Sequence, residues 1–312
     1  MRVSLTLRLA NIPNPPAHIT PNLGAARLAI LFSGGLDCTV LARLAHDILP
    51  LDERIDLLNV AFENPRLHQS GDNLLKPERT PYELCPDRIT GRSSYAELVR
   101  VSPERQWRFV AINIPYTENL KHRETVVSLM HPHNTEMDLS IASALYFAAR
   151  GEGQVSDIPT DMTTHYTSTT RVLISGLGAD EIFAGYTRHA TAYRRGGLEA
   201  LLKEMEIDVT RLGKRNLGCD DRVMSHWGKE VRFPYLDESL LAWALDAPVD
   251  LKCGFGESQT GSAISSDGSS SSSLPPDKKV LRCLASKLGM PGVAREKKRA
   301  VSRSACKHIV TY

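Results

Sequence analysis

The sequence predicts an α/β fold, a doubly wound parallel sheet with flanking helices. Short and continuously apolar runs, typical of strands buried on both faces, recur along the chain. Segments with helical spacing of apolar residues alternate with these runs. Two of the runs end directly in a Ser-Gly turn, at residues 33–34 and 175–176. Right-handed crossovers place the carboxyl ends of parallel strands along one edge of a sheet, so both turns are expected at that edge.

The predicted elements begin after a proline-containing segment. Residues 1–27 hold four prolines, which fix φ and remove donors, so an extended lead-in is expected there. Four apolar runs are predicted strands: residues 28–32, 55–62, 109–114 and 171–174. Helical patterns are found at residues 40–48, 138–149 and 179–194. The second of these patterns is apolar nearly all round, which predicts a helix buried against the sheet.

Two stretches interrupt the alternation and set the expected domain boundaries. Residues 64–95 are rich in Pro, Asn and Arg without periodicity, and are interpreted as a long loop. The main domain is expected over residues 28–257, followed by a serine-rich flexible segment at 258–276. Residues 277–312 are interpreted as a helix and a basic tail of the same domain, the helix ending near Gly289 and Pro291.

Composition excludes several classes of protein. Among 312 residues, Lys and Arg exceed Asp and Glu by two, so no nucleic-acid partner is expected. The sequence has no apolar run of about 18 residues and no signal-peptide pattern, so no membrane partner is expected. The six cysteines form no C-x-x-C pair, which argues against a zinc site or a dense disulfide framework. A cytoplasmic, reducing location is therefore expected.

The first turn, Ser33-Gly34-Gly35-Leu36-Asp37, joins a predicted buried strand to a predicted helix. Glycines let backbone N–H groups approach an anion closely, and the helix N-terminus adds partial positive charge. The turn therefore predicts a phosphate cradle. Asp37 would repel a phosphate, so its expected role is to hold Mg²⁺ that bridges phosphate oxygens. The alternative is an ordinary tight turn that Asp37 caps.

The second turn, Ser175-Gly176-Leu177-Gly178-Ala179-Asp180-Glu181, follows another apolar strand. Its two carboxylates open the next helix, where they suit the helix dipole, so simple capping is the alternative interpretation. Together with the first turn the pattern becomes more specific. Asp37 and Asp180 are expected to face each other across the crevice and to share the metal ion.

These residues carry a family resemblance. The first turn resembles the PP-loop of ATP pyrophosphatases, with Cys38 where that family usually has Ser. Both turns, together with the Val231-Arg232-Phe233-Pro234-Tyr235-Leu236-Asp237 stretch, resemble the asparagine synthetase family, closest to its asparagine synthetase domain-containing branch. The resemblance implies Mg²⁺ on Asp37 and Asp180. It also implies an ATP site made of Phe32, Ser33, Gly34, Gly35, Asp37, Val60, Ser175 and Gly176.

The chemistry implied by the resemblance is adenylation of the aspartate side chain, followed by attack of ammonia to give asparagine. Leu177 stands where asparagine synthetases have Glu, which puts the amidation step in question. No glutaminase half is expected, because Arg2 follows the first Met where that domain needs Cys, so ammonia would come from solution or from a separate glutaminase chain. The alternative is a catalytically weakened homologue that binds nucleotide and acts through protein partners.

Two further sets of residues are candidates. The resemblance implies a catalytic Lys in the C-terminal basic segment, and Lys298 is the best match. A cation there would stabilise departing pyrophosphate, although a solvated basic tail is the alternative. The charged residues Arg215, Asp220, Asp221 and Arg222 either form a structural ion-pair network or bind a carboxylate substrate, and the structural interpretation is favoured.

Overall fold

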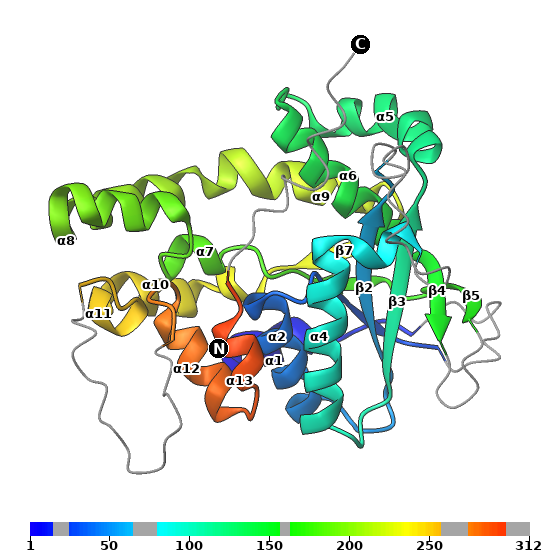
Figure 1. The fold of residues 1–312 in the computed structure, drawn as a ribbon, viewed down its shortest axis with the longest axis horizontal. Coiled ribbons are helices and arrows are strands. Elements are labelled where there is room, and N and C mark those ends of the chain that lie inside the picture. Colours follow the sequence, from blue (N-terminus) through cyan, green and yellow to red (C-terminus); the bar gives the residue numbers. More distant parts are fainter. Residues whose placement is uncertain (15–24, 65–79, 157–162, 257–273, 298–312) are drawn as a thin grey trace, which may run out of the picture.

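The computed structural model describes residues 1–14, 25–64, 80–156, 163–256 and 274–297. Its centre is a seven-stranded sheet with the order β5-β4-β3-β2-β1-β6-β7 (Figure 1). The strands are β1 (Leu28–Leu31), β2 (Ile55–Phe62), β3 (Trp107–Ile114), β4 (Glu152–Ser156), β5 (Thr163–Thr167), β6 (Val172–Ile174) and β7 (Glu230–Arg232). The run from β3 to β7 is parallel throughout, and β4 and β5 add an antiparallel hairpin at one edge.

Helices cover both faces of this sheet. One face packs against α1 (Arg2–Leu9), α2 (Leu36–Ile48), α4 (Pro86–Val101), α12 (Lys279–Lys287) and α13 (Pro291–Arg295). The other face packs against α5 (Tyr116–Met130), α6 (Glu136–Arg150) and α9 (Gly218–Ser225). Successive strand residues alternate between the two cores, since Ile30 lies in the first and Ala29 in the second. The α/β doubly wound fold class is therefore confirmed.

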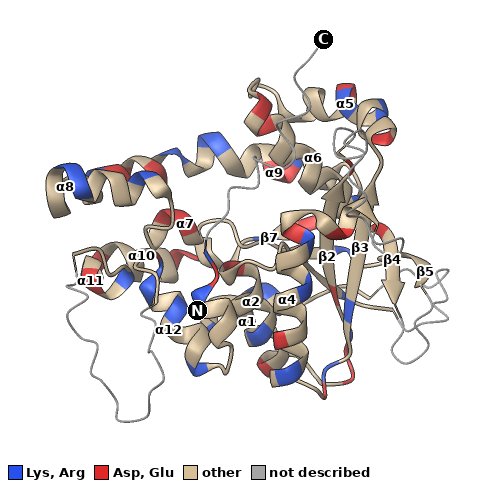
Figure 2. Ribbon diagram, in the orientation of Figure 1, with Lys and Arg blue, Asp and Glu red and all other residues tan. Residues whose placement is uncertain are grey.

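The remaining elements extend from the carboxyl end of the sheet. They are α7 (Ala179–Ile182), α8 (Thr187–Leu212), α10 (Glu238–Asp246), α11 (Val249–Lys252), the short helices η1 (Pro81–Leu84) and η3 (Pro234–Leu236), and the π-helical segment η2 (Gly213–Leu217). Acidic and basic residues are interspersed along α5 and α8 (Figure 2). Among the described residues, no helix is both long and apolar enough to cross a membrane.

The strand order reverses at β1, and this reversal positions the site. β1 pairs with β2 on one side and with β6 on the other, with Ile30 opposite both Leu57 and Ile174. The carboxyl ends of β1 and β6 therefore lie side by side, and the two Ser-Gly turns leave the sheet next to each other. Such a topological switch point opens a crevice between the loops that follow the two strands.

The lead-in prediction for residues 1–27 is wrong in its first part. Residues 2–9 form α1, which buries Leu5 and Leu9 against the core. Arg8 pairs with Asp237 at 2.7 Å, and the Ser4 hydroxyl donates to the carbonyl of Pro234. The i, i+4 spacing of the two leucines was the available signal, and the prolines that suggested an extended chain begin only at Pro13.

The loop prediction for residues 64–95 is also wrong in part, because η1 and α4 occupy residues 81–84 and 86–101. The buried residues of α4 are mostly polar or small, so the helix has little apolar periodicity to read: Arg88, Thr90, Gly91, Ser94 and Leu98. The Arg88 guanidinium is fully buried and donates to Asn59 Oδ1 at 2.6 Å and Glu83 Oε1 at 2.8 Å. Hydrogen bonding thus stabilises a face that apolar packing usually stabilises.

Candidate functional site

The first turn is built by strand β1, two glycines and the start of α2. Gly34 has a left-handed φ of +82°, and a Cβ there would lie 2.5 Å from the backbone of Gly91 in α4. Only glycine fits this backbone and this approach. The Gly35 N–H donates weakly to Ser33 Oγ at 3.4 Å. The turn therefore presents a hydroxyl and backbone groups at the N-terminus of a 13-residue helix.

The Cys38 thiol is used inside this turn. It donates to the Gly35 carbonyl at 3.3 Å and lies 3.8 Å from Ser33 Oγ. Burial raises the pKa of Cys38, and the neighbouring Asp37 raises it further. The thiol therefore stays neutral and acts as a small packing group with a weak hydrogen bond.

The second turn packs directly onto the first. A Cβ at Gly176 would lie only 3.1 Å from Cβ of Asp37, so a side chain there would require the two turns to shift by a few tenths of an ångström. The Leu177 N–H donates to Ser175 Oγ at 3.2 Å, and the Tyr235 hydroxyl donates to the Asp37 carbonyl at 3.1 Å. The predicted convergence of the two turns is thus present, over a separation of about 140 residues.

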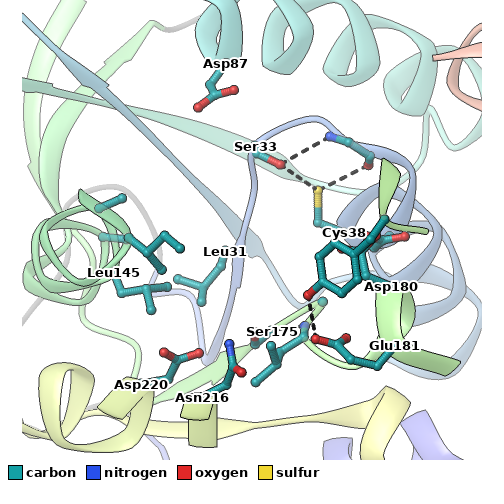
Figure 3. A pocket seen from close by; sticks show the side chains of 18 of the residues that line it. Leu31, Ser33, Cys38, Asp87, Leu145, Ser175, Asp180, Glu181, Asn216 and Asp220 are labelled. Carbon is teal, nitrogen blue, oxygen red and sulfur yellow. Dashed lines mark hydrogen bonds between the residues drawn. The ribbon is translucent and has the colours of Figure 1, made fainter. Parts of the chain in front are cut away.

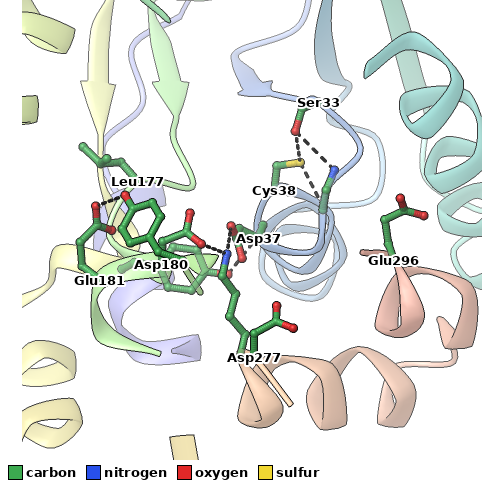
Figure 4. A network of polar contacts seen from close by, with 12 residues as sticks. Ser33, Asp37, Cys38, Leu177, Asp180, Glu181, Asp277 and Glu296 are labelled. Atoms are coloured by element: carbon green, nitrogen blue, oxygen red, sulfur yellow. Dashed lines mark hydrogen bonds and ion pairs between the residues drawn. The ribbon is translucent and has the colours of Figure 1, made fainter. Parts of the chain in front are cut away.

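Asp37 and Asp180 point toward one another, as predicted (Figure 4). An ammonium group lies between the two carboxylates. The Nζ atom of Lys278 is 2.6 Å from Asp37 Oδ2 and 2.7 Å from Asp180 Oδ1. Only 5% of the Lys278 side chain is exposed. Burial opposes the charge, yet Asp180 and Asp37 together hold the pKa of Lys278 above its ordinary value. This cation was not predicted from the sequence.

Local backbone features hold Lys278 in place. Its φ is +51°, and its backbone N–H donates to the Phe183 carbonyl at 3.1 Å, just before α12 begins. The side chain passes over Gly185, where a Cβ would collide with both Lys278 Cε and Asp180 Oδ1. Gly185 is therefore needed for the ion pair to form. In the sequence, Lys278 stands between a pair of prolines and a strongly amphipathic helical pattern. This arrangement by itself does not predict a binding site.

A cavity of about 610 Å³ opens at these turns (Figure 3). This volume is within the usual range for a small-molecule site. Seven of the eight residues predicted for ATP line it: Phe32, Ser33, Gly35, Asp37, Val60, Ser175 and Gly176. Gly34 instead packs against α4 within the turn. An apolar wall comes from one side of α6 with β1 and β2: Leu31, Leu58, Met137, Ile141, Ala144, Leu145 and Ala148.

A second group of charged side chains lines the same cavity. The Tyr186 hydroxyl donates to Glu181 Oε1 at 2.6 Å, and burial followed by Glu181 raises the pKa of Tyr186. Arg188 contacts Asp208 Oδ1 at 2.5 Å and stacks over the Tyr186 ring at 4.0 Å. Asp220 also lines the cavity, and burial followed by repulsion from Glu181 raises its pKa to about 7. Sequence reasoning had assigned no separate role to Glu181 or Tyr186.

The other candidates have separate outcomes. Lys298 lies outside the described residues, as does nearly all of the serine-rich segment. The Arg222 guanidinium donates to the carbonyls of Leu129 and His131, which is a structural role, whereas Asp220 faces the cavity. Asp237 caps α10 by accepting from two backbone N–H groups. Among the described residues, no group of three or more His, Cys, Asp or Glu side chains is arranged to hold a metal.

The parallel sheet, its switch point and the glycine turn after β1 define a protein with the PP-loop fold. A profile of the asparagine synthase family matches residues 195–308. The chain is 37% identical over 303 residues to asparagine synthetase domain-containing protein 1 of Mus musculus, covering 88% of this chain and 45% of that protein. It is 35% identical to an asparagine synthetase domain-containing protein of Saccharomyces cerevisiae, covering 98% of this chain and 51% of that protein.

A shorter match links the chain to a third protein, named as a putative glutamine-hydrolyzing asparagine synthetase of Methanocaldococcus jannaschii. The identity is 46% over 82 residues, covering 26% of this chain and 15% of that protein. The chain therefore belongs to the asparagine synthetase family and is similar to its domain-containing proteins over the synthetase region. It spans about half the length of the curated relatives that it matches along most of its own length.

Proposed function

We propose that this chain activates a carboxylate with ATP, forming an acyl-adenylate and pyrophosphate, and that the acyl group is then transferred to ammonia. The aspartate side chain is the proposed carboxylate, and ammonia comes from solution or from a separate glutaminase chain. The observation that carries the proposal is the convergence of Asp37 and Asp180 on one cation beside a glycine turn. The family membership supports it.

The donor set fits Mg²⁺ that arrives with a nucleotide. Mg²⁺ prefers oxygen ligands and is usually held by one or two carboxylates with phosphate oxygens and waters. Asp37 and Asp180 already stabilise one cation between them, so the local charge suits a positive ion. When bound, Mg²⁺ would neutralise phosphate charge during the displacement. Asp37 and Asp180 would hold it, once Lys278 contacts phosphate oxygens instead.

The residues of this chain divide the remaining work. Ser33 and the N-terminus of α2 donate hydrogen bonds to the β- and γ-phosphates. The apolar wall with Val60 accommodates the adenine and excludes water from the reacting carboxylate. The Lys278 ammonium stabilises the charge that develops on departing pyrophosphate, a role that the sequence had suggested for Lys298.

The measurement that tests this proposal is ATP–pyrophosphate exchange on the purified chain with L-aspartate. We expect exchange that depends on aspartate and is abolished by Asp37→Ala, whereas Asp47→Ala on the outer end of α2 leaves it unchanged. Absence of exchange with L-aspartate and with other carboxylates would refute carboxylate activation.

A second candidate function is favoured by Leu177. Its side chain lines the cavity in the second turn, where it can neither titrate nor donate a hydrogen bond. A nucleotide-binding homologue that acts through protein partners would bind ATP without turnover. In that case ATP raises the melting temperature of the chain, Asp37→Ala removes the effect, and no pyrophosphate is released.

A further inference from the structure

Asp220 differs from the other carboxylates that line the cavity. It lies on α9 and is 8% exposed, and no hydrogen bond or ion pair of its carboxylate is found among the described residues. The other lining carboxylates each have an interaction partner: Asp37, Asp87, Asp138, Asp180, Glu181 and Asp208. Figure 3 shows Asp220 among the side chains around the cavity.

An unpaired carboxylate at this depth is costly to keep charged. Its pKa of about 7 reflects that cost, because burial disfavours the charged form and Glu181 adds repulsion. A positive group bound in the cavity would offset both effects. Arg215 lines the same cavity but is exposed and forms no ion pair with Asp220 within 4.0 Å.

The chemistry of the neighbours selects the kind of cation. A divalent metal needs several oxygen ligands, and Glu181 already accepts a hydrogen bond from Tyr186. Asp220 has Asn216 as its neighbour on the cavity wall, which adds an amide oxygen that can accept a hydrogen bond. A small monovalent cation with several N–H donors matches one carboxylate and one amide oxygen.

We propose that Asp220 is the binding residue for a primary ammonium group in this cavity. The inference rests on the proposed function, whose substrates supply such a group from two sources. One is the α-ammonium of the amino acid, and the other is the ammonium ion that provides the amide nitrogen. Asp220 gives the site its preference for substrates that carry this group.

Two kinetic measurements with Asp220→Asn separate the sources. ATP–pyrophosphate exchange needs no ammonium, so a rise in the KM for L-aspartate identifies the α-ammonium. Amide formation with ammonium chloride instead reports the KM for ammonium. We expect one of these constants to rise about 10- to 100-fold, the usual effect of losing a charge-assisted hydrogen bond. Asp221→Asn, at the exposed neighbouring position, should change neither constant by more than about twofold. Both KM values unchanged in Asp220→Asn would overturn the proposal.

A binding measurement keeps this test separate from the proposed function. We compare ammonium chloride with tetramethylammonium chloride at equal ionic strength, because the second cation has no N–H donor. Ammonium should raise the melting temperature of the wild-type chain by about 2 °C more than tetramethylammonium does. The difference should vanish in Asp220→Asn and persist in Asp221→Asn. Equal shifts in the wild type would refute the ammonium site even if exchange is observed, and a selective shift without exchange would refute only the proposed function.

Discussion

Replacing Lys278 by Met tests the charge arrangement at the centre of the site. The substitution keeps an unbranched apolar stem as far as Cε but removes the ammonium that Asp37 and Asp180 share. The two carboxylates then face each other without a cation between them. Removing one partner of a buried ion pair usually costs about 3–5 kcal/mol. Asp37 and Asp180 are 23% and 21% exposed, so water screens part of the repulsion, and we expect about 3 kcal/mol.

Urea unfolding measures this loss. With a slope of about 3 kcal/mol per M, the midpoint should fall by about 1 M. Lys279→Met is the matched control, because Lys279 is the next residue, does not line the cavity and donates to the Asp250 carbonyl at 3.3 Å. Its midpoint should move by no more than about 0.2 M.

Magnesium provides the second half of the test. Without the ammonium, the two carboxylates form a vacant dication site, and MgCl₂ at ten times its dissociation constant should restore about 1.4 kcal/mol. The wild-type chain should gain much less, because Lys278 competes for the same oxygens. A loss below about 1 kcal/mol in Lys278→Met, or equal magnesium stabilisation of both proteins, would falsify the idea that this lysine occupies the cation position.

Three further predictions follow from the packing and charges. Gly176→Val should separate the two turns and weaken ATP binding at least about tenfold by calorimetry, because even a Cβ added there would lie 3.1 Å from Asp37 Cβ. The control is Gly213→Ala, which has open space around it and should bind ATP as the wild type does. Asp220 has a folded pKa of about 7 against 3.8 in the unfolded chain, so its contribution to stability is present at low pH and is lost as the pH rises from about 4 to 7. Asp220→Asn should therefore be more stable than the wild type at pH 8, by up to about 4 kcal/mol, with the advantage vanishing near pH 4; equal stability at both pH values would contradict the raised pKa. Arg88→Met should lower the free energy of unfolding, measured in urea, by about 3–5 kcal/mol, because it removes a fully buried guanidinium and leaves its acceptors unpaired. A loss below about 1 kcal/mol would contradict that structural role.

The first turn was predictable because its signals are local. An apolar run ends in Ser33, two glycines follow, and an amphipathic helix begins at once. Each of these features depends only on the nearest few residues. The meeting of the two turns followed from a topological rule, since parallel strands with right-handed crossovers direct their carboxyl ends to one edge.

The helix α4 was missed because tertiary contacts replaced the usual pattern. Arg88 on its buried face donates hydrogen bonds to Asn59 and Asn113 in neighbouring strands, and Gly91 is buried because the turn at Gly34 packs onto it. Neither contact requires apolar residues at helical spacing, so the sequence of α4 shows no helical pattern. Composition alone therefore indicated a loop where the folded chain has a helix.

Lys278 was missed for a different reason, which also explains how the site works. Its partner Asp37 is 241 residues away, and the contact requires the chain to return across the serine-rich segment to the first turn. A lysine in that position makes the site neutral enough to fold without a metal, because one ammonium offsets much of the repulsion between two carboxylates. If a nucleotide binds with Mg²⁺ as proposed, Asp37 and Asp180 would hold the metal, and the ammonium of Lys278 would be free to contact the phosphates. Lys278 would then stabilise the empty site first and the leaving group afterwards, and its position directly before α12 fixes it to the C-terminal helices.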